Sequence, residues 1–150
     1  MSASRAVSPP TALSMPALRG DVHCVWEAAA VLGEGTCWSP RTQTLWWVDI
    51  LQRRLYSLRP ADDARASWQF DEEVSAVAEH AEAPGLIVTL RRGYALFDPD
   101  ANHAAPRYLH EPPAEPPGNR FNDGKCDPQG RFWVGTIYEP RDQPLASLYC

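Results

Sequence analysis

The sequence has little positive charge and no long apolar run. Its 14 Lys and Arg residues are outnumbered by 19 Asp and Glu residues, which gives a net charge of −5. It therefore lacks the basic surface that nucleic-acid-binding proteins use. No stretch approaches the roughly 18 apolar residues that a membrane span needs. The first 20 residues also lack the continuous apolar region of a signal peptide. These absences favour a cytoplasmic protein that binds neither nucleic acid nor membrane.

Several catalytic and metal-binding motifs are missing as well. The four cysteines, at positions 24, 37, 126 and 150, form no CxxC pair, and no histidine lies at zinc-finger spacing from them. We expect free thiols in a reducing compartment. A G-x-S-x-G nucleophile elbow and a P-loop are also absent, so neither a serine hydrolase of that type nor a nucleotide-phosphate site is indicated.

Turn-forming residues are abundant. The chain has 15 Pro and 9 Gly among 150 residues, a density that opposes long helices and favours short strands joined by tight turns. Prolines also interrupt residues 1–20, which we interpret as a flexible N-terminal tail. Residues 21–150 are then expected to form the folded part of the chain.

Three stretches of the chain resemble one another, at residues 37–60, 74–100 and 125–150. Each contains a strongly apolar strand followed by a turn and a further strand, rich in aromatic and β-branched residues. The expected strand pairs are 45–48 with 54–58, 86–90 with 94–97, and 131–135 with 146–149. A spacing of about 43 residues is the size of a four-stranded propeller blade. The pattern predicts an all-β fold with about three blades, hence part of a larger β-propeller; the alternative is a complete small β-sandwich.

A carboxylate between two glycines is the first candidate for chemistry. Glu34 lies between Gly33 and Gly35, which lack bulky side chains and allow close approach of a ligand. Oxygen ligands of this kind suit a hard cation such as Ca²⁺ or Mg²⁺. The alternative is a turn with a solvated glutamate.

A second candidate lies in residues 118–125. Arg120 and Asn122 are two residues apart, so they would share one face of an extended strand. An arginine fork can hold carboxylate or sugar oxygens, and an asparagine can bind a hydroxyl or a metal. Alternatively, Asn122 begins a turn with Asp123 and Gly124. Glu139 follows the third apolar strand and either lines a pocket or is a surface charge.

Three of these segments together resemble the SMP-30/gluconolactonase/regucalcin-like family. They are LGEG, W-x-P and LWWVDI within residues 32–50, LYSLRP at 55–60, and RFNDGKCDPQGRFWVGT at 120–136. The resemblance covers about residues 25–150. It implies the N-terminal half of a six-bladed propeller, with one divalent metal in the central channel (Ca²⁺, Zn²⁺, Mn²⁺ or Mg²⁺). It also implies hydrolysis of a small sugar lactone.

The resemblance assigns roles to single residues. Glu34 matches a metal ligand of the family, and Arg120 and Asn122 match residues that face the substrate. Glu139 lies beside the position of a substrate-binding glutamate. The remaining metal ligands, an asparagine and an aspartate that is also the candidate general base, are expected beyond residue 150, in the missing C-terminal half of the propeller.

Two alternatives keep the fold and change the function. One is a non-catalytic, calcium-binding regulatory propeller. The other is a protein-interaction propeller of the WD40 or NHL kind, although no blade has the Gly-His and Trp-Asp signature of WD40 repeats.

Overall fold

The computed structural model describes residues 20–81, 83–112 and 115–150. Most of the predicted tail, residues 1–19, lies outside this part of the chain. The described residues form three antiparallel sheets and contain no helix, so none is long and apolar enough to cross a membrane. The all-β prediction is confirmed.

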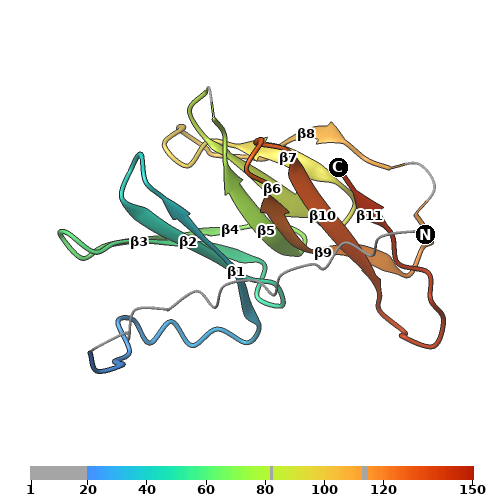
Figure 1. Ribbon diagram of the computed structural model, residues 1–150, viewed down its shortest axis with the longest axis horizontal. Helices are drawn as coiled ribbons and strands as arrows, with labels where there is room; N and C mark the ends of the chain where they lie inside the picture. Colours follow the sequence, from blue (N-terminus) through green and yellow to red (C-terminus); the bar gives the residue numbers. More distant parts are fainter. Residues whose placement is uncertain (1–19, 82, 113–114) are drawn as a thin grey trace, which may run out of the picture.

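The strands follow one another in chain order within each sheet (Figure 1). Blade 1 consists of β1 (Gly33–Ser39), β2 (Thr44–Asp49), β3 (Arg54–Arg59) and β4 (Ala64–Gln69). Blade 2 consists of β5 (Val74–Glu79), β6 (Leu86–Leu90), β7 (Tyr94–Phe97) and β8 (Arg107–His110). Blade 3 consists of β9 (Asn119–Cys126), β10 (Phe132–Tyr138) and β11 (Leu148–Tyr149). This succession of up-and-down sheets is the predicted blade architecture.

Side chains alternate across the strands, and each face of blade 1 has its own packing. Trp46 and Val48 of β2 point to the buried face. Trp47 points the other way and stacks on Tyr56 of β3, with ring centroids 5.2 Å apart and planes 7° apart. Trp26, from the segment before β1, meets the Trp47 ring edge-on at 5.1 Å. Because successive residues of a strand face opposite sides, one apolar run can supply both packing layers.

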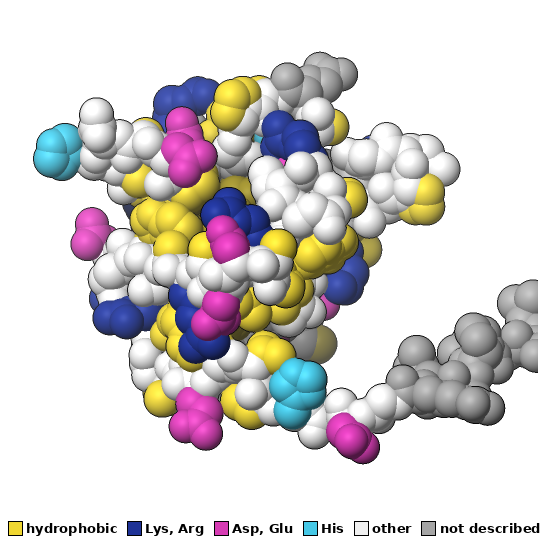
Figure 2. Space-filling view, turned by 90° about the vertical axis from the view of Figure 1, so that its left-hand side faces the viewer, with side chains coloured by type: hydrophobic (Ala, Val, Ile, Leu, Met, Phe, Trp, Pro, Cys, Tyr) yellow, Lys and Arg dark blue, Asp and Glu magenta, His cyan; other side chains and the backbone are white. Residues whose placement is uncertain are grey.

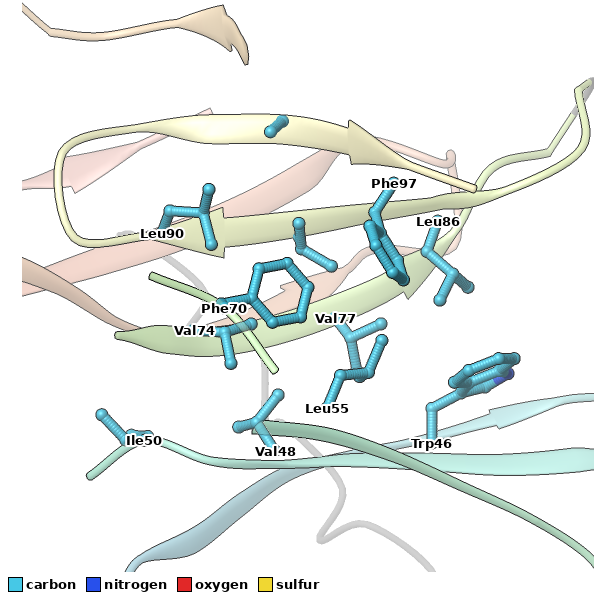
Figure 3. Packing of buried hydrophobic residues seen from close by; sticks show 12 residues of the cluster. Trp46, Val48, Ile50, Leu55, Phe70, Val74, Val77, Leu86, Leu90 and Phe97 are labelled. Carbon is cyan, nitrogen blue, oxygen red and sulfur yellow. The ribbon is translucent and has the colours of Figure 1, made fainter. Parts of the chain in front are cut away.

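The main core lies between blades 1 and 2. In Figure 3, Val48 and Leu55 of blade 1 extend toward Val77 and Phe97 of blade 2, with Phe70 between the sheets. Val48 and Leu55 are fully buried. Full burial of such a side chain stabilises a fold by about 1.5–3 kcal/mol. This interface therefore holds the two blades in a fixed relation.

Hydrophobic surface is not confined to this core. Figure 2 looks onto the side of the molecule that is on the left in Figure 1, and shows hydrophobic side chains at the surface between scattered charged ones. Trp38 of β1 and Leu51 after β2 are among the large hydrophobic residues that remain exposed.

The first strands of the three blades lie together. β5 contacts both β1 and β9, and β1 also contacts β9. In Figure 1 these three strands lie near the centre of the molecule, whereas β8 lies at its upper edge. We refer to β1, β5 and β9 as the inner strands.

Candidate functional site

Each inner strand is irregular near its beginning. The pairing register shifts between Glu34 and Cys37 in β1, and between Val74 and Ala76 in β5. In blade 3 the shift on β10 between Val134 and Thr136 lies opposite the Asn122–Asp123 step of β9. A β-bulge leaves a residue unpaired and turns its side chain away from the regular direction. One irregularity therefore follows directly after Glu34, and another contains Asn122, so both lie at predicted site residues.

Contacts between neighbours place these irregular segments at one end of the inner strands. A Cβ built on Gly35 would lie 3.3 Å from the Ser75 carbonyl oxygen, so the beginnings of β1 and β5 are in contact. The beginning of β5 pairs with the end of β6 through Val74 and Leu90. The next residue, Arg91, accepts a hydrogen bond of 3.4 Å at its carbonyl from the Phe121 backbone N–H of β9. Glu34 and the Arg120–Asn122 pair thus belong to the same end of the molecule.

A buried carboxylate holds the segment that carries Glu34. Asp49, at the end of β2, is fully buried and accepts hydrogen bonds from the backbone N–H groups of Val31 (2.7 Å) and Leu32 (3.1 Å). It also accepts one from Gln52 at 3.0 Å. Burial on its own would raise the pKa of Asp49, but the hydrogen bonds from Gln52, Val31 and Leu32 together lower it. Asp49 therefore stays ionised and fixes the entry to β1.

The Glu34 side chain itself is partly exposed on β1. Within the described ranges it has neither a hydrogen-bond nor an ion-pair partner, and none joins it to Arg120 or Asn122. The neighbouring Gly35 has a φ of +64°, a conformation that side chains of L-residues rarely adopt. Glu34 is thus an open carboxylate on a backbone that glycine shapes, as a metal ligand would need to be.

Arg120 is a deeply buried charge, with only 6% of its side chain exposed. Its Nη1 donates to the Asn122 Oδ1 at 3.1 Å and to the Phe121 carbonyl at 3.0 Å. Its Nε donates to Glu139 Oε1 at 3.1 Å. The Arg120–Asn122 pair is therefore formed on an extended strand, and the alternative of a turn at Asn122–Gly124 does not hold.

Glu139 lies between two arginines from different blades. Its second oxygen, Oε2, accepts a hydrogen bond of 2.6 Å from Arg91 Nη2. The pKa of Glu139 is lowered, chiefly by the hydrogen bond from Arg91. Burial acts to raise this pKa, and the hydrogen bond from Arg120 lowers it further. Arg91 also forms an ion pair with Glu73 at 3.3 Å. Glu139 is thus 40% exposed but is engaged at both oxygens.

A pocket of about 390 Å³ opens beside these groups. Blades 2 and 3 and the link between them supply its walls, including Arg91, Glu115, Asn119, Arg120, Phe121 and Thr136. Glu115 accepts hydrogen bonds from the Asn119 amide and the Tyr149 hydroxyl. The Asn119 Oδ1 is buried without a hydrogen-bond partner. The pocket therefore combines arginine donors with amide and carboxylate acceptors, a combination that suits a hydroxylated ligand.

Sequence reasoning missed part of this arrangement. Arg91 gave no signal, because its importance depends on Glu139, 48 residues away in another blade. Glu72 and Glu73, adjacent in the sequence, also gain partners from residues distant in the sequence. Glu72 accepts a hydrogen bond from the Tyr108 hydroxyl, and Glu73 pairs with Arg91.

The described residues meet the needs of a metal only in part. Glu34 offers a free carboxylate, but residues 20–81, 83–112 and 115–150 bring together no group of three His, Cys, Asp or Glu side chains that could hold an ion. Calcium takes six to eight oxygen ligands. One carboxylate is too few, so these residues do not form a complete metal site.

The sequence is similar to those of known sugar lactonases. The chain is 43% identical over 122 residues to 6-deoxy-6-sulfogluconolactonase of Pseudomonas putida, which covers 81% of this chain and 41% of that protein. It is 34% identical over 127 residues to L-arabinolactonase of Azospirillum brasilense, covering 85% of this chain and 41% of that one. The chain thus spans about two fifths of the length of these relatives.

The solved structures agree with the fold. A calcium-binding protein of Agrobacterium tumefaciens, regucalcin, matches with a TM-score of 0.71 and 29% identity, over 80% of this chain and 40% of that one. The sequence model of the family described as the SMP-30/Gluconolactonase/LRE-like region matches residues 32–150 of this chain. This range contains all three inner strands and every predicted site residue. The chain therefore belongs to the SMP-30/gluconolactonase/LRE-like family.

Proposed function

We propose that the full-length protein hydrolyses a small sugar lactone. The observation that carries the proposal is the common location of an open carboxylate, Glu34, and the pair of buried Arg120 and half-buried Asn122 at one end of the inner strands. The names of the lactonase relatives support the reaction class. The four cysteines are free, which fits the proposed cytoplasmic location.

The proposal assigns substrate binding to Arg120 and Asn122. The Arg120 Nη2 group has no hydrogen-bond partner within the described ranges, and Arg120 lines the pocket of about 390 Å³. A guanidinium donor and an amide can hold the hydroxyl and ring oxygens of a sugar lactone and orient its carbonyl. Glu139 is a less direct participant, because both of its oxygens are occupied by arginines.

The proposal also includes one divalent cation, Ca²⁺, Zn²⁺, Mn²⁺ or Mg²⁺, with Glu34 as one ligand. Bound there, such an ion would supply Lewis-acid polarisation of the lactone carbonyl. Its other ligands, and the general base, would come from later blades of the full-length protein. The unpartnered state of Glu34 and the solved calcium-binding regucalcin support this assignment.

A turnover assay tests the function. The full-length protein is offered aldonolactones and a sulfonated sugar lactone, with each divalent ion in turn and with a chelator. We expect ring opening above the spontaneous rate, loss with the chelator, and recovery when metal is restored. Ring opening at the spontaneous rate for every lactone and ion would contradict the proposal.

A calcium-binding regulatory propeller is the second candidate. The open Glu34 carboxylate and the regucalcin structure favour it equally. The two candidates differ in the assay above: the regulatory protein would bind calcium in a titration but leave all the lactones intact.

A further inference from the structure

Arg120 cannot keep its orientation by packing alone. Its guanidinium is almost fully buried, and a buried charge needs partners that are themselves held in place. Asn122 and the Phe121 carbonyl accept hydrogen bonds from Nη1, but both belong to the same strand as Arg120. Neither of them holds Nε on the opposite side of the guanidinium. The carboxylate of Glu139, directly after β10, accepts a hydrogen bond from Nε. The position of Glu139 therefore decides where the Arg120 donors point.

Glu139 in turn is held from another blade. Its carboxylate is 40% exposed, so without a second partner it could turn toward solvent. Arg91, in the turn after β6 of blade 2, donates to it at 2.6 Å. The other arm of the Arg91 fork pairs with Glu73, just before β5, at 3.3 Å. Since the two arms engage carboxylates of different blades, Arg91 ties the beginning of blade 2 to the end of β10.

We infer that Arg91 is a positioning residue for substrate binding, acting through Glu139 to set the direction of the Arg120 guanidinium. This inference rests on the proposed function for its kinetic consequence, and on geometry alone for its structural one. It gives Glu139 a role that differs from direct contact with the substrate. It also explains why a surface-facing glutamate is engaged at both oxygens.

The kinetic test compares variants of the full-length protein with its best lactone. Arg91→Met removes both arms of the fork. We expect KM to rise about tenfold with kcat little changed, because the lost contact stabilises the bound substrate and the transition state equally. Arg91→Lys should recover part of the affinity, since an ammonium reaches one carboxylate but not both in fork geometry. Glu139→Gln should resemble Arg91→Met.

A double variant separates positioning from a general effect on the fold. If Arg91 acts only through Arg120, adding Arg91→Met to Arg120→Ala changes KM no further. The matched control is Arg41→Met. This substitution breaks a 2.8 Å ion pair with Glu79, which likewise connects two blades, in this case blades 1 and 2. We expect this control to leave KM unchanged. Independent, multiplying effects of the Arg91 and Arg120 substitutions on KM would overturn the inference.

A spectroscopic measurement decides the structural part without substrate. The Arg120 Nε–H resonance in a ¹⁵N spectrum reports its hydrogen bond to Glu139. We expect Arg91→Met and Arg91→Lys to shift or broaden it, and Arg41→Met to leave it in place. An unchanged resonance in both Arg91 variants refutes the inference even when the protein hydrolyses lactones. If the wild type hydrolyses none, the proposed function fails, and this spectrum still decides whether Arg91 positions Arg120.

Discussion

Gly35 of β1 packs against the backbone of Ser75 in β5, and a Cβ at Gly35 would lie only 3.3 Å from the Ser75 carbonyl oxygen. This contact joins the beginnings of two inner strands. It lies next to Glu34, and Gly35 has a φ of +64°. The glycine therefore meets two requirements at once: a left-handed backbone and a close approach between blades.

Replacing this glycine tests both requirements. We expect Gly35→Ala to lower the free energy of unfolding by about 1–3 kcal/mol, from backbone strain and crowding. Gly130→Ala is the matched control, because Gly130 also has a positive φ (+80°) but has no atom within 4 Å of a built Cβ. Chemical denaturation of both variants measures the difference. Equal losses would mean that the contact with Ser75 contributes nothing.

The strands with strong side-chain patterns could be predicted from the sequence. The expected strands at 45–48, 54–58, 86–90 and 94–97 match β2, β3, β6 and β7 to within one or two residues. The outer strands β4 and β8 were not located. Their residues are mostly exposed, and backbone pairing with a neighbouring strand defines them rather than an apolar pattern.

The candidate site divides in a similar way. Glu34, Arg120 and Asn122 have local signals, namely flanking glycines and an i, i+2 spacing. Their common location at one end of the inner strands depends on contacts between blades, which no local pattern contains. The same holds for Arg91, whose partner Glu139 lies in the next blade.

The lowered pKa of Asp49 predicts how the stability of the protein changes at acid pH. Because its folded pKa is lowered, its contribution is complete above the unfolded value of about 3.9 and is lost as the pH falls through the folded value. We expect Asp49→Asn to cost about 1–3 kcal/mol at pH 7, since one oxygen replaces two acceptors of backbone N–H groups. The free energy of unfolding of Asp49→Asn should also fall less than that of the wild type as the pH is lowered from 5 through the folded pKa of Asp49.

Unfolding curves over this pH range provide the measurement. Asp142→Asn is the control, because Asp142 is exposed and has no hydrogen bond or ion pair within the described ranges. Its curve should follow the wild type. The role given to Asp49 is wrong if Asp49→Asn follows the wild-type curve as well.

Arg120→Ala should affect both binding and stability. Its side chain is buried and holds the Phe121 carbonyl, so its loss should cost about 1–3 kcal/mol. In the full-length protein we expect KM for the lactone to rise by at least about tenfold, with a smaller effect on kcat. Steady-state kinetics below the midpoint of thermal unfolding separates the two effects. A normal KM would remove Arg120 from the substrate site.

Metal titration of the full-length Glu34→Gln protein tests the proposed site most directly. Substituting a residue that hydrogen-bonds to a metal ligand typically weakens metal affinity by about 10–100-fold. We therefore expect loss of a direct carboxylate ligand to weaken metal binding by at least about tenfold. Lactone turnover should fall with it. Glu27→Gln, at an exposed glutamate of the preceding segment, should bind metal like the wild type. Wild-type metal affinity in Glu34→Gln, with lactone turnover intact, would contradict the assignment of the inner-strand carboxylate.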